Sequence, residues 1–264
     1  MSNNLGRFCW YELMTTDVDA AVDYYGKVVG WTTVDGPTAT SAPGEMPYRL
    51  LQAGQTGTGG IMALRPEAIA AGARPAWLGY VAVDDVDAYS DRVTEAGGAV
   101  HMSPTDIPGV GRFSVIADPH GAMLVLFRPG MEGQPLPANP TQSGLFSWRE
   151  LSGGDLDRDF AFYSSLFGWK RGDTVPMGDA GIYQLFTEAD GGPAIGGMMT
   201  RLPTAPVPMW SYYVLVDSAS AAADRVRAHG GTVLSGPHPV PGGLWVLQTL
   251  DPQGAMIGMN SPNP

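Results

Sequence analysis

The sequence predicts an α+β fold built from four modules, each a strand followed by a helix and three further strands. Two observations carry this prediction. The stretch FCWYELMTTDVDAAVDYYGKVVGW at residues 8–31 returns as FSWRELSGGDLDRDFAFYSSLFGW at residues 146–169. Within each half, the strand-then-helix pattern also occurs twice. Because an internal repeat defines an architecture as a whole, the 264 residues are expected to contain the module four times.

The first module begins with alternating apolar and polar residues at 7–14, which indicate a strand. A helix is predicted from Asp17 to about Val28, because Asp17 is suited to an N-cap and apolar residues follow at helical spacing. Gly30 is suited to end it. The remaining elements of this half are expected as strands at 31–35, 46–53, 59–65 and 77–83, a helix at 84–96, and strands at 99–102, 112–117 and 122–128.

The second half repeats these elements in order. GGIM at 59–62 returns as GGMM at 196–199, and DPHGAM at 118–123 returns as DPQGAM at 251–256. Between the halves, residues 128–144 are rich in Pro and Gly and lack apolar periodicity, as is typical of a linker. We therefore predict one domain at 1–128, a linker at 129–143 and a second domain at 144–264.

Composition restricts the possible partners. The formal net charge of −11 disfavours binding to nucleic acid or to anionic membranes. No stretch has the roughly 18 apolar residues of a membrane span, and the start of the chain lacks a signal-peptide core. The single cysteine, Cys9, cannot form an internal disulfide and is expected to be a buried, inert thiol. We expect a cytoplasmic monomer or homodimer that binds a small molecule.

These repeated motifs resemble the vicinal oxygen chelate superfamily, which includes glyoxalase I, bleomycin-resistance proteins and extradiol dioxygenases. The resemblance rests on DVDAAVDYYGKVVGW and its copy, and on the paired DPxGAM turns, and it covers nearly the whole chain outside the linker. The stretch PTDIPGVGRFSVIADPHGAM is similar to a two-domain bacterial subgroup of glyoxalase-like or hydroxylase-like proteins. The resemblance implies two glyoxalase-like domains, in each of which paired βαβββ modules form a curved mixed sheet, a cup with the ligand on its concave face.

The resemblance also implies a divalent metal held by His, Gln and Glu side chains, and this sequence departs from that pattern. The matching positions are occupied by residues that do not bind a hard metal. They are Trp10, Leu78, Val125 and residues 60–62 in the first half, and Trp148, Ser211, Gly258 and residues 197–199 in the second. We therefore expect neither a metal nor another cofactor.

The four histidines do not restore a metal site, because no two of them have a ligand spacing. His120 is expected at the solvent-facing tip of the DPHG turn, and His101, His229 and His238 are expected on a strand, at a helix end and in a loop.

Glu12 and Glu150 are the candidate catalytic residues. Alternation places Glu12 on the same strand face as Trp10, and Glu150 on the same face as Trp148. A carboxylate in an aromatic pocket loses hydration, which raises its pKa and suits it to acid–base chemistry. Alternatively, the two carboxylates are structural and either cap a neighbouring backbone or pair with an arginine. The candidates are Arg49 and Arg112 for Glu12, and Arg201 for Glu150.

Soft and aromatic side chains are expected to line both cups, which would suit a flat apolar ligand. Asp106 and Arg112 have no counterparts in the second half, which makes the first cup the preferred site. The predicted substrate-binding residues are Trp10, Met62, Tyr80, Arg112 and Met123 in the first half, and Trp148, Met199, Tyr213, Trp245 and Met256 in the second.

Three functions remain open. The first is a metal-independent isomerase, lyase or hydratase, or a hydroxylase-like enzyme, acting on a carbonyl-bearing, aromatic or polyketide-like compound. The second is a non-catalytic protein that binds or sequesters an antibiotic-like small molecule. The third is a metal-dependent glyoxalase or dioxygenase with atypical ligands.

Overall fold

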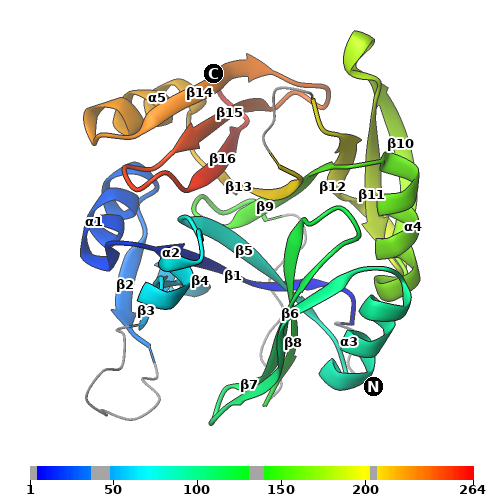
Figure 1. Cartoon of the computed structure of the whole chain (residues 1–264). Helices are drawn as coiled ribbons and strands as arrows, with labels where there is room; N and C mark the ends of the chain where they lie inside the picture. Colours follow the sequence, from blue (N-terminus) through cyan, green and yellow to red (C-terminus); the bar gives the residue numbers. More distant parts are fainter. Residues whose placement is uncertain (1–4, 37–47, 131–139, 203–206) are drawn as a thin grey trace. The chain divides into compact units, whose positions relative to one another are not determined.

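A computed structural model describes residues 5–36, 48–130, 140–202 and 207–264. Figure 1 shows their arrangement, in which the βαβββ order occurs four times. The first half contains β1 (Phe8–Thr15), α1 (Val18–Val28), β2 (Thr32–Asp35), β3 (Tyr48–Ala53), β4 (Thr56–Ala63), α2 (Pro66–Ala70), β5 (Ala76–Ala82), α3 (Val86–Glu95), β6 (Ala99–Ile107), β7 (Gly111–Ala117) and β8 (Met123–Pro129). The second contains β9 (Phe146–Gly153), α4 (Leu156–Phe167), β10 (Lys170–Pro176), the 3-10 turn η1 (Gly178–Ala180), β11 (Ile182–Glu188), β12 (Gly191–Thr200), β13 (Met209–Leu215), α5 (Ala219–Ala228), β14 (Thr232–Pro239), β15 (Trp245–Leu250) and β16 (Met256–Ser261).

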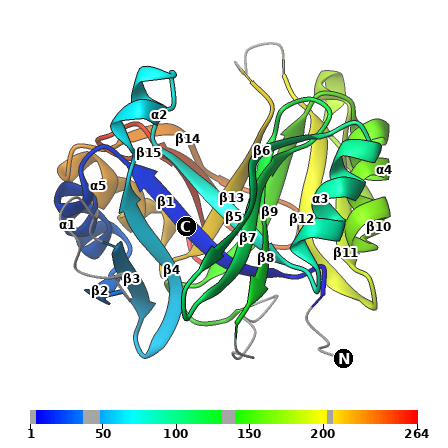
Figure 2. The same cartoon turned by 60° about the horizontal axis from the view of Figure 1, so that its bottom comes forward.

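The strands form two mixed sheets of eight, one from each half of the sequence. The orders are β2-β3-β4-β1-β5-β8-β7-β6 and β10-β11-β12-β9-β13-β16-β15-β14. Strand β1 runs parallel to β4, with Glu12 opposite Gly60, whereas β2, β3 and β4 pair in antiparallel fashion and lie as neighbours in Figure 2. The predicted α+β class, with its glyoxalase-like βαβββ modules, is confirmed. Helix α2 was not predicted, because five residues are too few to show helical periodicity.

Each long helix begins at a side-chain cap that the sequence shows directly. Asp17, Asp85 and Asp155 accept a hydrogen bond from the backbone N–H three residues further on, and Ser218 does the same before α5. Such caps satisfy amide groups that have no partner within the helix. This explains why the acidic residue after the first strand recurs in the repeat.

By their contacts, the residues group into two compact units, each of which combines segments from both halves of the sequence. Unit 1 comprises residues 1–9, 79–139 and 148–211, and unit 2 comprises residues 10–78, 140–147 and 212–264. Helices α3 and α4 lie together in unit 1, as α1 and α5 do in unit 2 (Figure 1). The domain boundaries expected from the sequence stay a prediction, and most of the expected linker, residues 131–139, lies outside the described part of the chain.

A tryptophan and a tyrosine anchor the DPxG turn inside each unit. In unit 1, Trp210 Nε1 donates to the Tyr163 hydroxyl over 2.9 Å, and Tyr163 donates to Asp118 over 2.9 Å. Asp118 also accepts the backbone N–H groups of His120 and Ala122. In unit 2, Trp77, Tyr25 and Asp251 form the same chain of hydrogen bonds. Burial first, and then the Asp251 charge, raises the pKa of Tyr25 well above its ordinary value, so the phenol keeps its proton.

The tryptophan that ends each repeated segment binds a glycine carbonyl from the other half. Trp31 Nε1 donates to Gly144 O over 2.7 Å in unit 2, and Trp169 Nε1 donates to Gly6 O over 2.7 Å in unit 1. Gly6 and Gly144 have φ values of 75° and 88°, and a Cβ on Gly6 would lie 2.6 Å from Phe167 O. Only glycine adopts this conformation and close approach without strain. These contacts explain why each unit combines the two halves.

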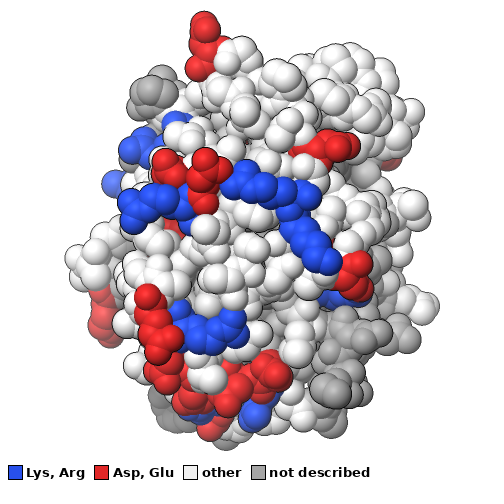
Figure 3. Space-filling view, turned by 90° about the vertical axis from the view of Figure 1, so that its right-hand side faces the viewer, with Lys and Arg blue, Asp and Glu red and all other residues white. Residues whose placement is uncertain are grey.

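Several charged side chains on the described surface lie beside a partner of opposite sign. Arg7 lies 2.9 Å from Glu188, and Arg171 lies 2.7 Å from Asp157. On the face in Figure 3, basic and acidic groups accordingly adjoin one another. Among the helices of the described residues, none has the length and apolar character needed to cross a bilayer.

Candidate functional site

The two faces of β1 have different environments. Tyr11, Leu13 and Thr15 are fully buried on one face. On the other face, Trp10 is half-buried, and Glu12 is buried with 7% of its surface exposed. The alternation expected from the sequence therefore places Trp10 and Glu12 on one side of the strand.

Tyr48 connects these two side chains in unit 2. Trp10 Nε1 donates to the Tyr48 hydroxyl over 2.9 Å, and Tyr48 is hydrogen-bonded to the Glu12 carboxylate. Burial first, and then the Glu12 charge, raises the pKa of Tyr48 far above its ordinary value. Tyr48 therefore stays protonated at neutral pH and holds Glu12 by a charge-assisted hydrogen bond.

Unit 1 contains the same arrangement. Trp148 Nε1 donates to the Tyr183 hydroxyl over 2.8 Å, and Tyr183 donates to Glu150 Oε2 over 3.0 Å. We call each set a Trp–Tyr–Glu triad: Trp10, Tyr48 and Glu12 in unit 2, and Trp148, Tyr183 and Glu150 in unit 1. The sequence analysis did not identify the two tyrosines, although aligning PYRLL at 47–51 with IYQLF at 182–186 shows that they recur at matching places.

Glycines in the neighbouring strands make room for the tyrosine rings. A Cβ on Gly60 would overlap the Tyr48 hydroxyl, and a Cβ on Gly197 would overlap the Tyr183 ring. Gly60 pairs with Glu12 in the β1–β4 register, and Gly197 pairs with Glu150 in the β9–β12 register. Each ring thus lies over the strand position where the resemblance would require a metal ligand.

The other positions matched to metal ligands offer no better donor set. Gly258 is covered by the Tyr213 ring, whose hydroxyl accepts a hydrogen bond from Gln248 Nε2 over 2.7 Å. In unit 1, Val125 is fully buried, and Tyr80, its partner in the β5–β8 register, packs edge-on against Phe127. Aromatic rings and aliphatic side chains at these positions do not fit the divalent metal of the superfamily.

The predicted catalytic and substrate-binding residues are divided between the two units. Unit 2 contains Trp10, Glu12, Met62, Tyr213, Trp245 and Met256, and unit 1 contains Tyr80, Arg112, Met123, Trp148, Glu150 and Met199. Their role in ligand binding stays a prediction. Among them, Met123 is 38% exposed, whereas Tyr80 and Tyr213 are buried.

Two of the three arginines expected near the glutamates, Arg49 and Arg112, pair with aspartates, whereas a pairing of Arg201 with Glu150 stays a prediction. Arg112 forms ion pairs with Asp87 at 2.7 Å and with Asp106 at 3.0 Å, and its hydrogen bonds to Asp87 lower the pKa of that carboxyl. Arg49 pairs with Asp35. Tyrosine, rather than Arg49 or Arg112, is therefore the partner of Glu12. The sequence indicated a buried charge that needed a partner, but the identity of that partner depends on strand register.

Cys9 donates its thiol to Tyr80 O over 3.5 Å, and burial raises its pKa to about 12. The thiol is therefore protonated at neutral pH and is a poor nucleophile.

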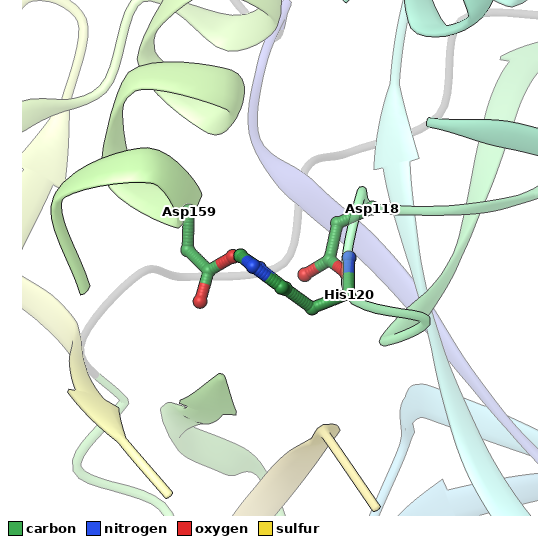
Figure 4. Close-up of side chains that lie close together, drawn as sticks. All are labelled: Asp118, His120 and Asp159. Atoms are coloured by element: carbon green, nitrogen blue, oxygen red, sulfur yellow. The ribbon is translucent and has the colours of Figure 1, made fainter. Parts of the chain in front are cut away.

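His120 does not lie at a solvent-facing tip, and that prediction was wrong. Its Nδ1 lies 2.5 Å from Asp159 Oδ1, and only 22% of its side chain is exposed. Figure 4 shows the imidazole, carried by the turn between β7 and β8, reaching Asp159 on α4, with Asp118 beside it. The ligand atoms of Asp118, His120 and Asp159 lie within 4.8 Å of one another. Asp159 is 13 positions beyond the start of the repeated segment, and nothing in the sequence connects it with residue 120.

Replacing Tyr48 with phenylalanine is expected to lower the free energy of unfolding by about 1–3 kcal/mol, because the buried Glu12 and Trp10 Nε1 each lose a hydrogen bond. Urea unfolding measures this change. Tyr89→Phe serves as the control, since the Tyr89 hydroxyl has no hydrogen-bond partner among the described residues. Equal effects of the two changes would contradict a stabilising role for the triad.

A known protein family and known proteins match both halves of this chain. The family model described as Glyoxalase/Bleomycin resistance protein/Dioxygenase superfamily matches residues 7–126 and 146–259. A Mycobacterium tuberculosis protein named "Putative glyoxylase CFP32" is 34% identical, over 97% of this chain and 94% of that protein. "Anthracycline biosynthesis protein DauV" of Streptomyces sp. (strain C5) is 31% identical, over 95% of this chain and 91% of that protein.

A solved structure shows the same fold at low sequence identity. The Mn(II)-bound glyoxalase from Novosphingobium aromaticivorans superposes with a TM-score of 0.64 and 16% identity, covering 99% of this chain and 83% of that one. The match of the family model to both halves, together with the full-length relatives, establishes the assignment. The chain belongs to the glyoxalase/bleomycin resistance protein/dioxygenase superfamily.

Proposed function

We propose that this protein is a small-molecule enzyme of the superfamily that catalyses proton transfer without a metal. The Trp–Tyr–Glu triads are its catalytic groups. The observation that carries the proposal is the tyrosine–glutamate hydrogen bond, which is present in each unit where the superfamily pattern calls for metal ligands. A carboxylate fixed by a protonated tyrosine is an oriented base.

The reaction would be an isomerisation or a related lyase or hydratase step on a compound that carries a carbonyl group. In the isomerisation, the Glu12 or Glu150 carboxylate would take a proton from the carbon next to the carbonyl and return it to another carbon, so that atoms and charge balance without an oxidant. Tyr48 or Tyr183 would keep its proton and hold the carboxylate in place. A relative named for anthracycline biosynthesis, 31% identical over nearly the whole chain, supports an aromatic, polyketide-like substrate.

Hydrogen–deuterium exchange tests the proton transfer directly. With an anthracycline aglycone in D2O, we expect the protein to catalyse deuterium incorporation next to the carbonyl, measured by mass spectrometry. Replacing both Glu12 and Glu150 with glutamine is expected to slow this exchange by about 100-fold or more, the lower range for loss of a general base. Each single variant would retain the exchange of the other triad.

Glu67→Gln is the matched control, because Glu67 is exposed on α2 and belongs to neither triad. Exchange that survives the double substitution would contradict a catalytic role for the carboxylates. Elemental analysis of the purified protein provides a second check, since a stoichiometric divalent ion required for exchange would contradict the metal-free mechanism.

The second candidate function is binding without chemistry. It is favoured by the presence of the same triad in both units, since two matched binding sites suit a sequestering protein as well as they suit an enzyme. In that case, the aglycone would quench tryptophan fluorescence from Trp10 and Trp148 and be recovered without deuterium.

A further inference from the structure

A group of four differences between the repeats meets at one place in unit 1. His120 and Asp159 of unit 1 stand where unit 2 has Gln253 and Ala21. Gly153 and Gly154 of unit 1 stand where unit 2 has Thr15 and Thr16. The surrounding framework is the same in both copies, because Asp118, Tyr163 and Trp210 repeat the hydrogen bonds of Asp251, Tyr25 and Trp77. The changed residues thus add a new arrangement to a retained scaffold.

The four changed residues fit one another. A Cβ on Gly154 would overlap the His120 ring, and a Cβ on Gly153 would overlap the Asp159 carboxylate. Threonine at these positions, as in the other copy, would therefore displace both side chains. Asp159 Oδ2 accepts the Asp155 backbone N–H over 3.2 Å, and the Asp159 side chain is only 1% exposed. The carboxylate is consequently fixed before it contacts the imidazole.

This geometry determines which ring nitrogen of the neutral His120 carries the proton and which can accept a hydrogen bond. The Asp159 carboxylate accepts from Nδ1, so the neutral imidazole carries its proton on Nδ1 and has an acceptor lone pair on Nε2. Nε2 has no hydrogen-bond partner among the described residues, and His120 remains partly accessible. Burial raises the pKa of Asp159, while the hydrogen bond from His120 opposes that shift.

The imidazole borders a cavity of about 550 Å³, which is also lined by Gly154, Arg201 and Pro208. The Arg201 backbone N–H donates to Gly153 O over 2.8 Å, which ties the arginine to the same loop as the two glycines. A cavity of this volume is within the usual range for small-molecule sites. His120, with its acceptor Nε2, and Arg201 both line it, and a guanidinium can bind a carboxylate through paired hydrogen bonds.

The metal alternative is weaker for the same three side chains. Both oxygens of Asp118 already accept hydrogen bonds, Oδ1 from two backbone N–H groups and Oδ2 from Tyr163. Both oxygens of Asp159 are likewise engaged, by His120 and by the Asp155 N–H. A cation would have to displace these bonds.

We propose that His120, oriented by Asp159, forms with Arg201 a second small-molecule site that binds a small hydroxy acid. The carboxylate of the ligand binds the Arg201 guanidinium, and its hydroxyl donates a hydrogen bond to His120 Nε2. This proposal does not depend on the function proposed for the Trp–Tyr–Glu triads.

Lactate and propionate test the proposal, because they have the same carbon skeleton and differ in the hydroxyl group. In protein labelled with 15N-histidine, we expect the His120 imidazole to be in the Nδ1–H form and lactate to shift its resonances saturably. Propionate is expected to bind about tenfold more weakly, a difference equivalent to one hydrogen bond of about 1.4 kcal/mol. Equal binding of the two acids, or no binding of lactate, would overturn the proposal.

Substitutions of His120 and Arg201 complete the test. H120Q, which introduces the residue found at position 253, is expected to abolish the preference for lactate over propionate while leaving the turn folded. R201Q is expected to weaken lactate binding by about tenfold or more. R227Q, at an exposed arginine on α5, serves as the control for a general loss of positive charge and should leave binding unchanged. If zinc, but neither acid, shifts the His120 resonances, the cluster is a cation site and the hydroxy-acid proposal fails.

Discussion

Replacing Trp169 with alanine is expected to lower the free energy of unfolding by about 3–5 kcal/mol, the range for removing a large aromatic side chain from a core. Trp169 is fully buried in unit 1. Its ring packs against Phe8, Phe186 and Tyr163, with centroids 5.5, 4.8 and 5.6 Å away. The substitution also removes the hydrogen bond from Nε1 to Gly6 O, which joins the start of the chain to the second half.

Urea unfolding followed by circular dichroism measures this loss, and Met177→Ala is the control in the same unit. Met177 is 46% exposed, so its truncation is expected to change stability by less than about 0.5 kcal/mol. Because Trp169 connects segments from both halves, we also expect Trp169→Ala to expose residues near Gly6 to proteolysis. A loss no larger than that of Met177→Ala would show that the cluster around Trp169 is not the core of unit 1.

Replacing Gly197 with alanine is expected to destabilise the protein by about 3–5 kcal/mol and to break the unit 1 triad. The added Cβ would overlap the Tyr183 ring, and moving an aromatic ring out of a packed site costs about 1–3 kcal/mol. The displaced ring would also lose its hydrogen bonds to Trp148 and Glu150, worth about 1 kcal/mol each. Gly60→Ala is expected to act in the same way on Tyr48 in unit 2.

Gly57→Ala is the matched control for Gly60→Ala, because both residues lie on β4. A Cβ on Gly57 would meet Trp10 at 3.8 Å, an ordinary van der Waals contact. We therefore expect Gly57→Ala to be neutral or slightly stabilising, since alanine loses less conformational entropy on folding than glycine. Tryptophan fluorescence gives a second measurement, because only Gly60→Ala should break the hydrogen bond between Trp10 Nε1 and Tyr48. Similar effects of the two alanines would contradict the tight fit of Tyr48 over Gly60.

Local signals in the sequence were sufficient to predict the modules. The Asp17 cap, the apolar spacing through Val28 and the Gly at position 30 belong to one helix and its ends, so they are readable without tertiary information. The matched copy around Asp155 gave the same result independently. Strand alternation also placed Glu12 beside Trp10, and both residues contact Tyr48 as a shared partner.

The sequence predicted only some of the residues of the candidate sites. Strand periodicity identified Glu12 and Glu150, but not the tyrosines that hold them, because Tyr48 and Tyr183 belong to other strands and reach the glutamates only through sheet register. His120 was placed in the correct turn but in the wrong environment. Its partner, Asp159, is 39 residues away along the chain, and a distance of that kind has no periodic signature.

The sequence by itself therefore determined the βαβββ modules, their duplication and the replacement of metal-ligand types by Trp, Val and Gly, because these depend on local propensity and residue identity. The tertiary structure alone decided which halves contribute to each compact unit, which hydroxyl binds each buried carboxylate, and that His120 meets Asp159 beside Arg201. These features depend on contacts between residues far apart in the chain, which packing and strand register select and local sequence does not encode.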